Sequence, residues 1–231
     1  MVSLQIAKIV VTGGPCGGKS TAVTWIRKAF AERGWHVLFI PETATELFLG
    51  GVPLFSHGHT MSFQTCNLSL QLEKERVFLE AARGLEAEKV LIVCDRGTLD
   101  NLAYMTPEAF AEAVAACGVT TQELYASYDA VFHLVTAAKG AEKYYTTENN
   151  TVRTETPAEA AALDDRVIAA WRDHPYFRQI DNSTGFEDKM ARLISGIEAF
   201  LRDHPGTRAR TPLKPPSPPP IRRTIIPQAK R

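Results

Sequence analysis

The stretch "VVTGGPCGGKS", residues 10–20, joins an expected strand to an expected helix. Residues 6–12 are mostly apolar and β-branched, which predicts a buried strand. Residues 20–33 repeat apolar side chains at helical spacing and are followed by a glycine, which predicts a helix. Between these elements, residues 13–20 match the pattern G-x-x-x-x-G-K-[S/T] in full. The order of strand, glycine-rich turn and helix is the context that gives this pattern its structural meaning.

The residue types of this loop suit a polyphosphate ligand. Several backbone N–H groups must converge on such an anion, and the turn that aims them inward favours glycine. The amino end of the following helix adds the positive end of its dipole. Lys19 would add a charge at the β- and γ-phosphates, the Ser20 hydroxyl would hold Mg²⁺, and the Thr21 hydroxyl would reach the α-phosphate. We expect the nucleotide to be bound by Gly13, Gly14, Pro15, Cys16, Gly17, Gly18, Lys19, Ser20 and Thr21.

Cys16 stands inside this loop, and two interpretations of it stay open. It is either a space-filling residue or a reactive thiol next to a lysine and a helix amino terminus.

Apolar, β-branched segments alternate with segments of helical periodicity along the rest of the chain. Such alternation is typical of parallel strands joined by right-handed helical crossovers. It predicts an α/β fold, a three-layer α/β/α sandwich around a five-stranded parallel sheet, with a polar insert over residues 137–156. The expected strands cover residues 6–12, 36–41, 89–95, 129–136 and 177–181. The expected helices cover residues 20–33, 61–86, 107–116, 121–127, 157–173 and 187–202.

The end of the chain differs from the rest in composition. Residues 205–231 hold eight of the fourteen prolines, which predicts an extended polyproline-type arm without a packed core. Residues 207–231 carry seven Lys or Arg and no Asp or Glu, so of the 26 charges of each sign, residues 1–206 keep 19 basic and 26 acidic groups. We expect a nucleotide-binding domain over 1–204 and a basic, proline-rich tail over 205–231. Two roles for the tail stay open: a linker, or a segment that docks a protein or an anionic surface. The acidic body argues against a nucleic-acid partner, because phosphate backbones attract clustered positive charge.

The cysteines and the amino terminus bear on the cellular compartment. The four cysteines form no C-x-x-C pair and no metal-ligand spacing with histidine. The first residues lack the basic region and apolar run of a signal peptide, and no apolar stretch approaches the ~20 residues that cross a bilayer. We therefore expect a cytoplasmic protein with reduced cysteines and no transmembrane segment.

Three classes of nucleotide-binding protein compete: motor ATPases, switch GTPases and phosphoryl-transfer kinases. The N-K-x-D tetrapeptide with which switch GTPases read guanine is absent from the sequence. In "LIVCDRG", residues 91–97, Asp95 is followed by Arg96 and not by the glutamate with which motor ATPases polarise water. The pattern favours a small kinase, which excludes water and admits the hydroxyl of a second substrate.

Two carboxylates, Glu42 and Asp95, fall at the carboxyl ends of expected strands. Ligands of open parallel sheets bind at this edge, beside the phosphate loop. One carboxylate there can accept the proton of an acceptor hydroxyl, and the other can hold Mg²⁺. The alternative for Glu42 is a charge at a helix amino terminus. For Arg96, an anchor for the acceptor and an ion pair with Asp100 are equally open.

With these motifs, the chain resembles the phosphate-loop (P-loop) kinases of nucleosides and related small molecules. It looks most like the nicotinamide riboside kinase and deoxynucleoside kinase branches, and it is closer still to a group of AAA-like ATP-binding proteins. The resemblance covers roughly residues 4–202. It implies the P-loop NTPase fold with a lid insert and transfer of the γ-phosphoryl group to a hydroxyl of a small, nucleoside-like acceptor. The implied cofactors are ATP and Mg²⁺, and GTP in place of ATP stays open.

The resemblance also implies catalytic and binding roles for residues beyond the loop. Glu42, in "FIPETATELF", or Asp95 would act as the base, and Glu42 and Arg96 would bind the acceptor. Asp95 would share Mg²⁺ with Ser20. Arg153, in the lid segment "KGAEKYYTTENNTVRTE", would close over the transferred phosphoryl group.

The loop "DNST", residues 181–184, would place Asp181 and Asn182 beside the adenine. The chain departs from the family where "DRS" or "DTS" is usual and "DRG" stands here, and where the lid has one clear arginine instead of several. A second function stays open: a regulatory ATP- or GTP-binding module with slow hydrolysis, whose tail docks a partner or anionic lipid.

Overall fold

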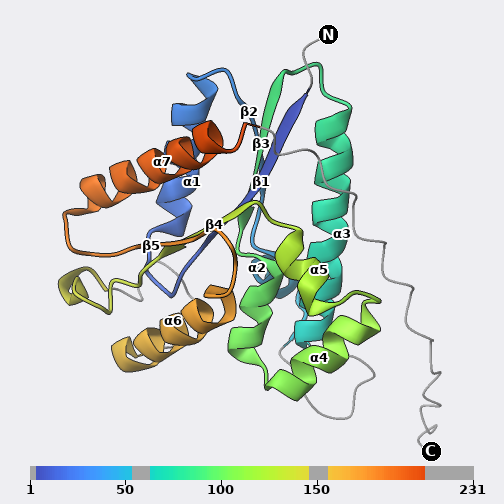
Figure 1. Ribbon diagram of the computed structural model, residues 1–231. Helices are drawn as coiled ribbons and strands as arrows, with labels where there is room; N and C mark the ends of the chain where they lie inside the picture. Colours follow the sequence, from blue (N-terminus) through green and yellow to red (C-terminus); the bar gives the residue numbers. More distant parts are fainter. Residues whose placement is uncertain (1–3, 54–62, 146–155, 206–231) are drawn as a thin grey trace, which may run out of the picture.

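The computed structural model describes residues 4–53, 63–145 and 156–205, and these form a sheet covered by helices on both faces (Figure 1). All paired strands are parallel, and their order across the sheet is β2-β3-β1-β4-β5. Strand β1 is therefore central, and the loop that follows it lies between the carboxyl ends of β3 and β4. The strands are β1 (Gln5–Thr12), β2 (His36–Ile40), β3 (Lys89–Asp95), β4 (Ala130–Leu134) and β5 (Phe177–Ile180).

The helices follow the strands in the expected order. The six expected helices are confirmed, whereas the short elements α2, η1 and η2 were not predicted; each is only a turn or two long, too short to show a clear helical period. The α-helices are α1 (Lys19–Ala31), α2 (Thr43–Leu49), α3 (Phe63–Arg83), α4 (Pro107–Ala116), α5 (Thr121–Ala126), α6 (Pro157–Trp171) and α7 (Phe186–Asp203). The 3-10 helices are η1 (Thr98–Tyr104) and η2 (Glu142–Tyr144).

A hydrophobic cluster lies on each face of the sheet, and strand β1 contributes to both clusters, because successive side chains of a strand point to opposite faces. Ala7, Ile9 and Val11 pack in a cluster with residues of α1 and α7. Ile6 and Val10 belong to the cluster on the other face, to which α3, α4 and α6 contribute. Helices α1 and α7 lie on one side of the sheet and α3 on the other in Figure 1. The predicted three-layer sandwich with a five-stranded parallel sheet is thus confirmed.

Several expectations concern residues outside the described ranges. Most of the proline-rich tail and the part of the insert that contains Arg153 lie there, so the domain boundary and the lid stay predictions. Across residues 4–53, 63–145 and 156–205, no helix is long and apolar enough to cross a membrane.

Candidate active site

The phosphate loop turns tightly between β1 and α1. Its backbone passes through the left-handed region at Gly13, Cys16 and Gly18, with φ values of 146°, 57° and 95°. The loop also passes very close to the end of β4. A Cβ atom on Gly13 or Gly17 would lie 2.1 or 2.6 Å from the carbonyl oxygen of Leu134, nearer than real contacts allow. Glycine at these positions therefore lets the loop rest on β4.

The amino end of α1 is open to a ligand. Its cap residue is Gly18, which has no side chain that could accept from the helix, and a helix begins with four N–H groups that lack intrahelical partners. Ser20 and Thr21, in the first turn, are exposed. Lys19 is buried, and its Nζ donates to the carbonyl oxygens of Gly13 and Gly14, each at 3.0 Å. The arrangement suits an anion at the helix terminus with an ammonium group beside it.

Glu42 and Arg96 form an ion pair where β2 and β3 end. Arg96 donates its Nε–H to Oε1 of Glu42, and the Thr45 hydroxyl lies 2.8 Å from Oε2. Burial alone would raise the pKa of Glu42, but the charges of Arg96 and Lys19 lower it to about 2. Glu42 precedes α2 without capping it through its side chain. Its carboxylate thus serves the ion pair and not the helix terminus.

The second alternative for Arg96, an ion pair with Asp100, is also present. The Nη1 of Arg96 lies 3.3 Å from Oδ1 of Asp100 and 3.3 Å from the Gly13 carbonyl oxygen. Arg96 itself has a left-handed backbone, with φ of 66°. One guanidinium group therefore links Glu42, Asp100 and the phosphate loop.

Residues of α3 and α6 that the sequence analysis missed help to hold this pair and Asp100 in place. From α3, the Gln71 amide donates to the Arg96 carbonyl oxygen at 3.1 Å, and the Lys74 ammonium donates to the Pro41 carbonyl oxygen at 2.7 Å. Asp100 accepts the Gly97 N–H at 2.8 Å and the indole N–H of Trp171 at 3.1 Å. The sequence signal for Asp100 is its position three residues after Gly97, the spacing of a helix cap.

The "DRG" sequence has a steric cause. A Cβ atom on Gly97 would lie 2.5 and 2.7 Å from the ring of Trp171 and 2.9 Å from Val10. The indole of Trp171 thus fills the space that the side chain of a "DRS" serine would need.

Asp95 ends β3 next to the end of β1, in register with Val11. Among the described residues, its Oδ1 is a buried oxygen without a hydrogen-bond partner. Burial raises the pKa of Asp95, the charge of Glu42 adds to the shift, and Lys19 opposes it. A buried carboxylate oxygen without a donor suits a hard cation such as Mg²⁺, which proteins hold through one or two carboxylates and the phosphates of the nucleotide.

The residues expected near the adenine contact other groups of the protein. Asn182 donates through its amide to the carbonyl oxygens of Thr136 and Lys139, at 2.8 and 2.7 Å. Asp181 is exposed and pairs with Arg192 at 2.8 Å. Contact with a base stays a prediction for both residues.

Comparisons with known proteins bear on the family and the fold of the chain. A family model described as "AAA domain" matches residues 8–189. A search of the curated proteins finds no match. Among solved structures, deoxyadenosine kinase from M. mycoides with bound dATP is similar at a TM-score of 0.53 and 15% identity, and the alignment covers 83% of this chain and 99% of that chain. At this identity the likeness concerns the fold. The chain therefore belongs to the AAA domain family, and its fold is that of a P-loop nucleoside kinase-like protein.

Proposed function

We propose that the protein is an ATP-dependent kinase that transfers the γ-phosphoryl group to a hydroxyl of a small, nucleoside-like acceptor. The observation that carries this proposal is the pairing of Glu42 with Arg96 beside the phosphate loop. A substrate hydroxyl placed here could donate its proton to the Glu42 carboxylate and lie near the positive charge of Arg96, next to the loop expected to hold the phosphates.

The loop and the first turn of α1 would bind the triphosphate through backbone N–H groups, with Lys19 at the β- and γ-phosphates. Ser20 and Asp95 would hold Mg²⁺, which when bound offsets the charge of the phosphates. The buried Oδ1 of Asp95, which has no hydrogen-bond partner within the described part of the chain, supports its part in this role.

Glu42 would orient the acceptor hydroxyl and take its proton. With a pKa of about 2, Glu42 is ionised at neutral pH but only weakly basic. Weak basicity is sufficient in phosphoryl transfer, because most analyses find a loose transition state that depends chiefly on positioning and charge. Arg96 would fix the carboxylate in place. Arg153 would neutralise the transferring group, and Asp181 and Asn182 would line the adenine.

ATP turnover by the purified full-length protein, measured with and without a panel of nucleosides, tests this function. We expect one or more nucleosides to raise the turnover and to appear as phosphorylated products in mass spectrometry. Glu42→Gln should keep Mg²⁺–ATP affinity and lose transfer, whereas Glu80→Gln, in an exposed pair with Arg83, should change neither.

Two results would contradict the proposal. Turnover that responds only to a protein partner or to anionic vesicles would favour the regulatory module. If the protein bound no purine triphosphate in the presence of Mg²⁺, the proposed nucleotide site itself would be wrong.

A further inference from the structure

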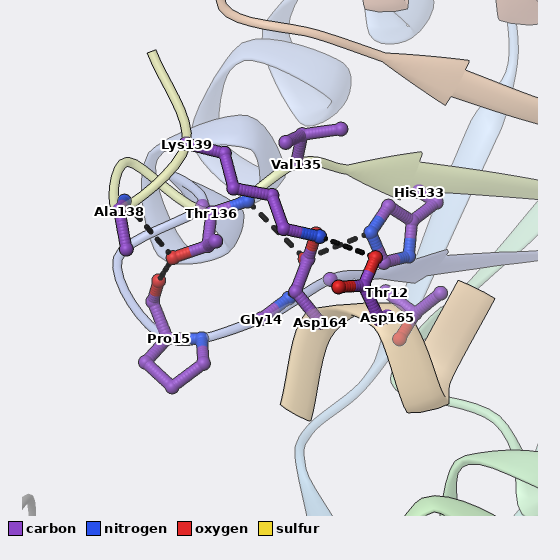
Figure 2. A network of polar contacts seen from close by, with 12 residues as sticks. Thr12, Gly14, Pro15, His133, Val135, Thr136, Ala138, Lys139, Asp164 and Asp165 are labelled. Carbon is purple, nitrogen blue, oxygen red and sulfur yellow. Dashed lines mark hydrogen bonds and ion pairs between the residues drawn. The ribbon is translucent and has the colours of Figure 1, made fainter. Parts of the chain in front are cut away.

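A buried carboxylate on α6 contacts the phosphate loop directly (Figure 2). The side chain of Asp164 is fully buried, and its Oδ1 accepts the backbone N–H of Gly14 at 2.8 Å. The two residues are 150 positions apart in the sequence. The contact is so close that a Cβ atom on Gly14 would lie 2.8 Å from this oxygen and 2.9 Å from the Cβ of Asp164. The second glycine of the loop therefore makes room for Asp164.

Asp164 is held in this position by three other donors. The His133 Nε2 and the Thr136 N–H lie 2.9 and 3.2 Å from Oδ1, and the Lys139 ammonium lies 3.0 Å from Oδ2. Burial would raise the pKa of Asp164, but the hydrogen bonds from His133 and Lys139 and from the Gly14 amide help to lower it to about 2. The carboxylate is thus ionised at neutral pH, so it only accepts, and the Nε2 of His133 carries a proton.

Two further side chains hold neighbouring backbone groups of the same loop. The Thr136 hydroxyl donates to the carbonyl oxygen of Pro15. From α7, the buried ammonium of Lys189 donates to the carbonyl oxygens of Gly17 and Val135, at 3.1 and 2.7 Å. Backbone groups at positions 14, 15 and 17 are therefore bonded to three separate parts of the fold.

We propose that Asp164 is a positioning residue which, with Thr136 and Lys189, holds the phosphate loop in its nucleotide-binding conformation before a nucleotide arrives. The proposal rests on nucleotide binding by residues 13–20. A glycine-rich loop loses much conformational freedom when it is ordered. Contacts that order it during folding remove that cost from the binding step, and pre-organisation of this kind increases affinity.

The test compares Asp164→Asn and Asp164→Ala with the control Asp165→Asn in the full-length protein. Asp165 is an ideal control, because it is mostly exposed and pairs with the same Lys139, at 2.7 Å, without a bond to the loop. The asparagine keeps an oxygen for the Gly14 N–H and loses the charge, whereas the alanine loses both.

The first measurement is Mg²⁺–ATP affinity by calorimetry at a temperature where each variant is folded. We expect the dissociation constant to rise about tenfold or more for Asp164→Ala, the scale of one hydrogen bond to a charged group. The dissociation constant of Asp164→Asn should lie between those of Asp164→Ala and the wild type, and that of Asp165→Asn should equal the wild-type value.

The second measurement is the alkylation rate of Cys16, in the loop, relative to Cys66 on α3, in the protein without nucleotide. A loosened loop should expose Cys16 selectively in both Asp164 variants. Global destabilisation would raise both rates together. Should Asp164→Ala not fold, Thr136→Val removes a different contact to the loop, the hydrogen bond to the Pro15 carbonyl oxygen. This variant should also bind Mg²⁺–ATP more weakly and expose Cys16 to alkylation, both to a smaller extent.

Unchanged affinity together with unchanged relative alkylation in the folded Asp164 variants would overturn the proposal while leaving the proposed function intact. A wild-type protein that binds no nucleotide would overturn both. A lower melting temperature with wild-type affinity would assign Asp164 a purely structural role.

Discussion

The Nε of Arg96 donates to Oε1 of Glu42, while Nη1 of the same guanidinium group reaches both Asp100 and the Gly13 carbonyl oxygen. The group at the end of β3 thus ties the carboxylate after β2 to the phosphate loop after β1. Chemistry at Glu42 should therefore depend on Arg96.

A double-mutant cycle tests this dependence. Arg96→Lys keeps the charge but loses the planar fork that reaches several acceptors at once. We expect Arg96→Lys and Glu42→Gln each to reduce phosphoryl transfer by about 10²- to 10⁴-fold. The double variant should transfer phosphoryl groups only slightly more slowly than the less active of the two single variants, because the two residues act as one unit. The measurement is kcat with saturating acceptor, and multiplicative losses would show that the residues act independently.

Lys19→Ala should abolish measurable nucleotide binding. The substitution removes the one side-chain cation of the loop, and charge-assisted hydrogen bonds to phosphate are roughly twice as strong as neutral ones. Lys28→Ala, in the last turn of the same helix, changes the net charge equally and should bind as the wild type does. Calorimetry with Mg²⁺–ATP measures both. Affinity within a factor of about three of the wild type for Lys19→Ala would show that the lysine does not contact the phosphates.

Acid should destabilise the protein through Glu42. Its pKa is about 2 in the folded protein, against an ordinary value of 4.5. Between these values the unfolded chain binds the proton and the folded protein does not, so the free energy of unfolding falls as the pH falls. The stabilisation is complete above pH 4.5 and is lost as the pH approaches about 2. We expect the melting temperature of Glu42→Gln to decline less steeply over this range than that of the wild type.

A matched control for the acid experiment is Glu80→Gln. Glu80 is part of an exposed pair with Arg83, and such pairs contribute little to stability. The melting temperature of Glu80→Gln should decline with falling pH as that of the wild type does. A decline as shallow as that of Glu42→Gln would mean that the loss of stability in acid is spread over surface groups.

Local patterns predicted the sheet and the phosphate loop well, because both depend on neighbouring residues. Strand β3 was predicted with its bounds, and the loop was recognised from eight consecutive positions. The residues that support the site could not be found in this way. Asp164 reaches Gly14 across 150 positions, and Gln71 reaches Arg96 from a helix whose sequence reads as ordinary and amphipathic.

One signal for Asp164 was nevertheless present in the sequence. It lies on the buried face of α6, one position after Leu163 and three before Val167. A carboxylate on an apolar helical face must find donors when it is buried, so such a residue indicates a tertiary polar contact. Which contact it makes depends on the crossover that brings α6 to the phosphate loop.

Gly97 offers a test of why glycine stands at this position. Its φ of −117° is accessible to any residue, so the steric contact with Trp171 alone should exclude a side chain. We expect Gly97→Ser to destabilise the protein by about 1–3 kcal/mol, the usual cost of overpacking a core. In Gly97→Ser combined with Trp171→Leu, the serine should cost less than it does in the wild-type background, because the smaller side chain leaves space for it. Urea denaturation measures the four free energies of unfolding. Strictly additive costs would show that the indole is not what fixes glycine at this position, and that another neighbour, such as Val10, sets the limit.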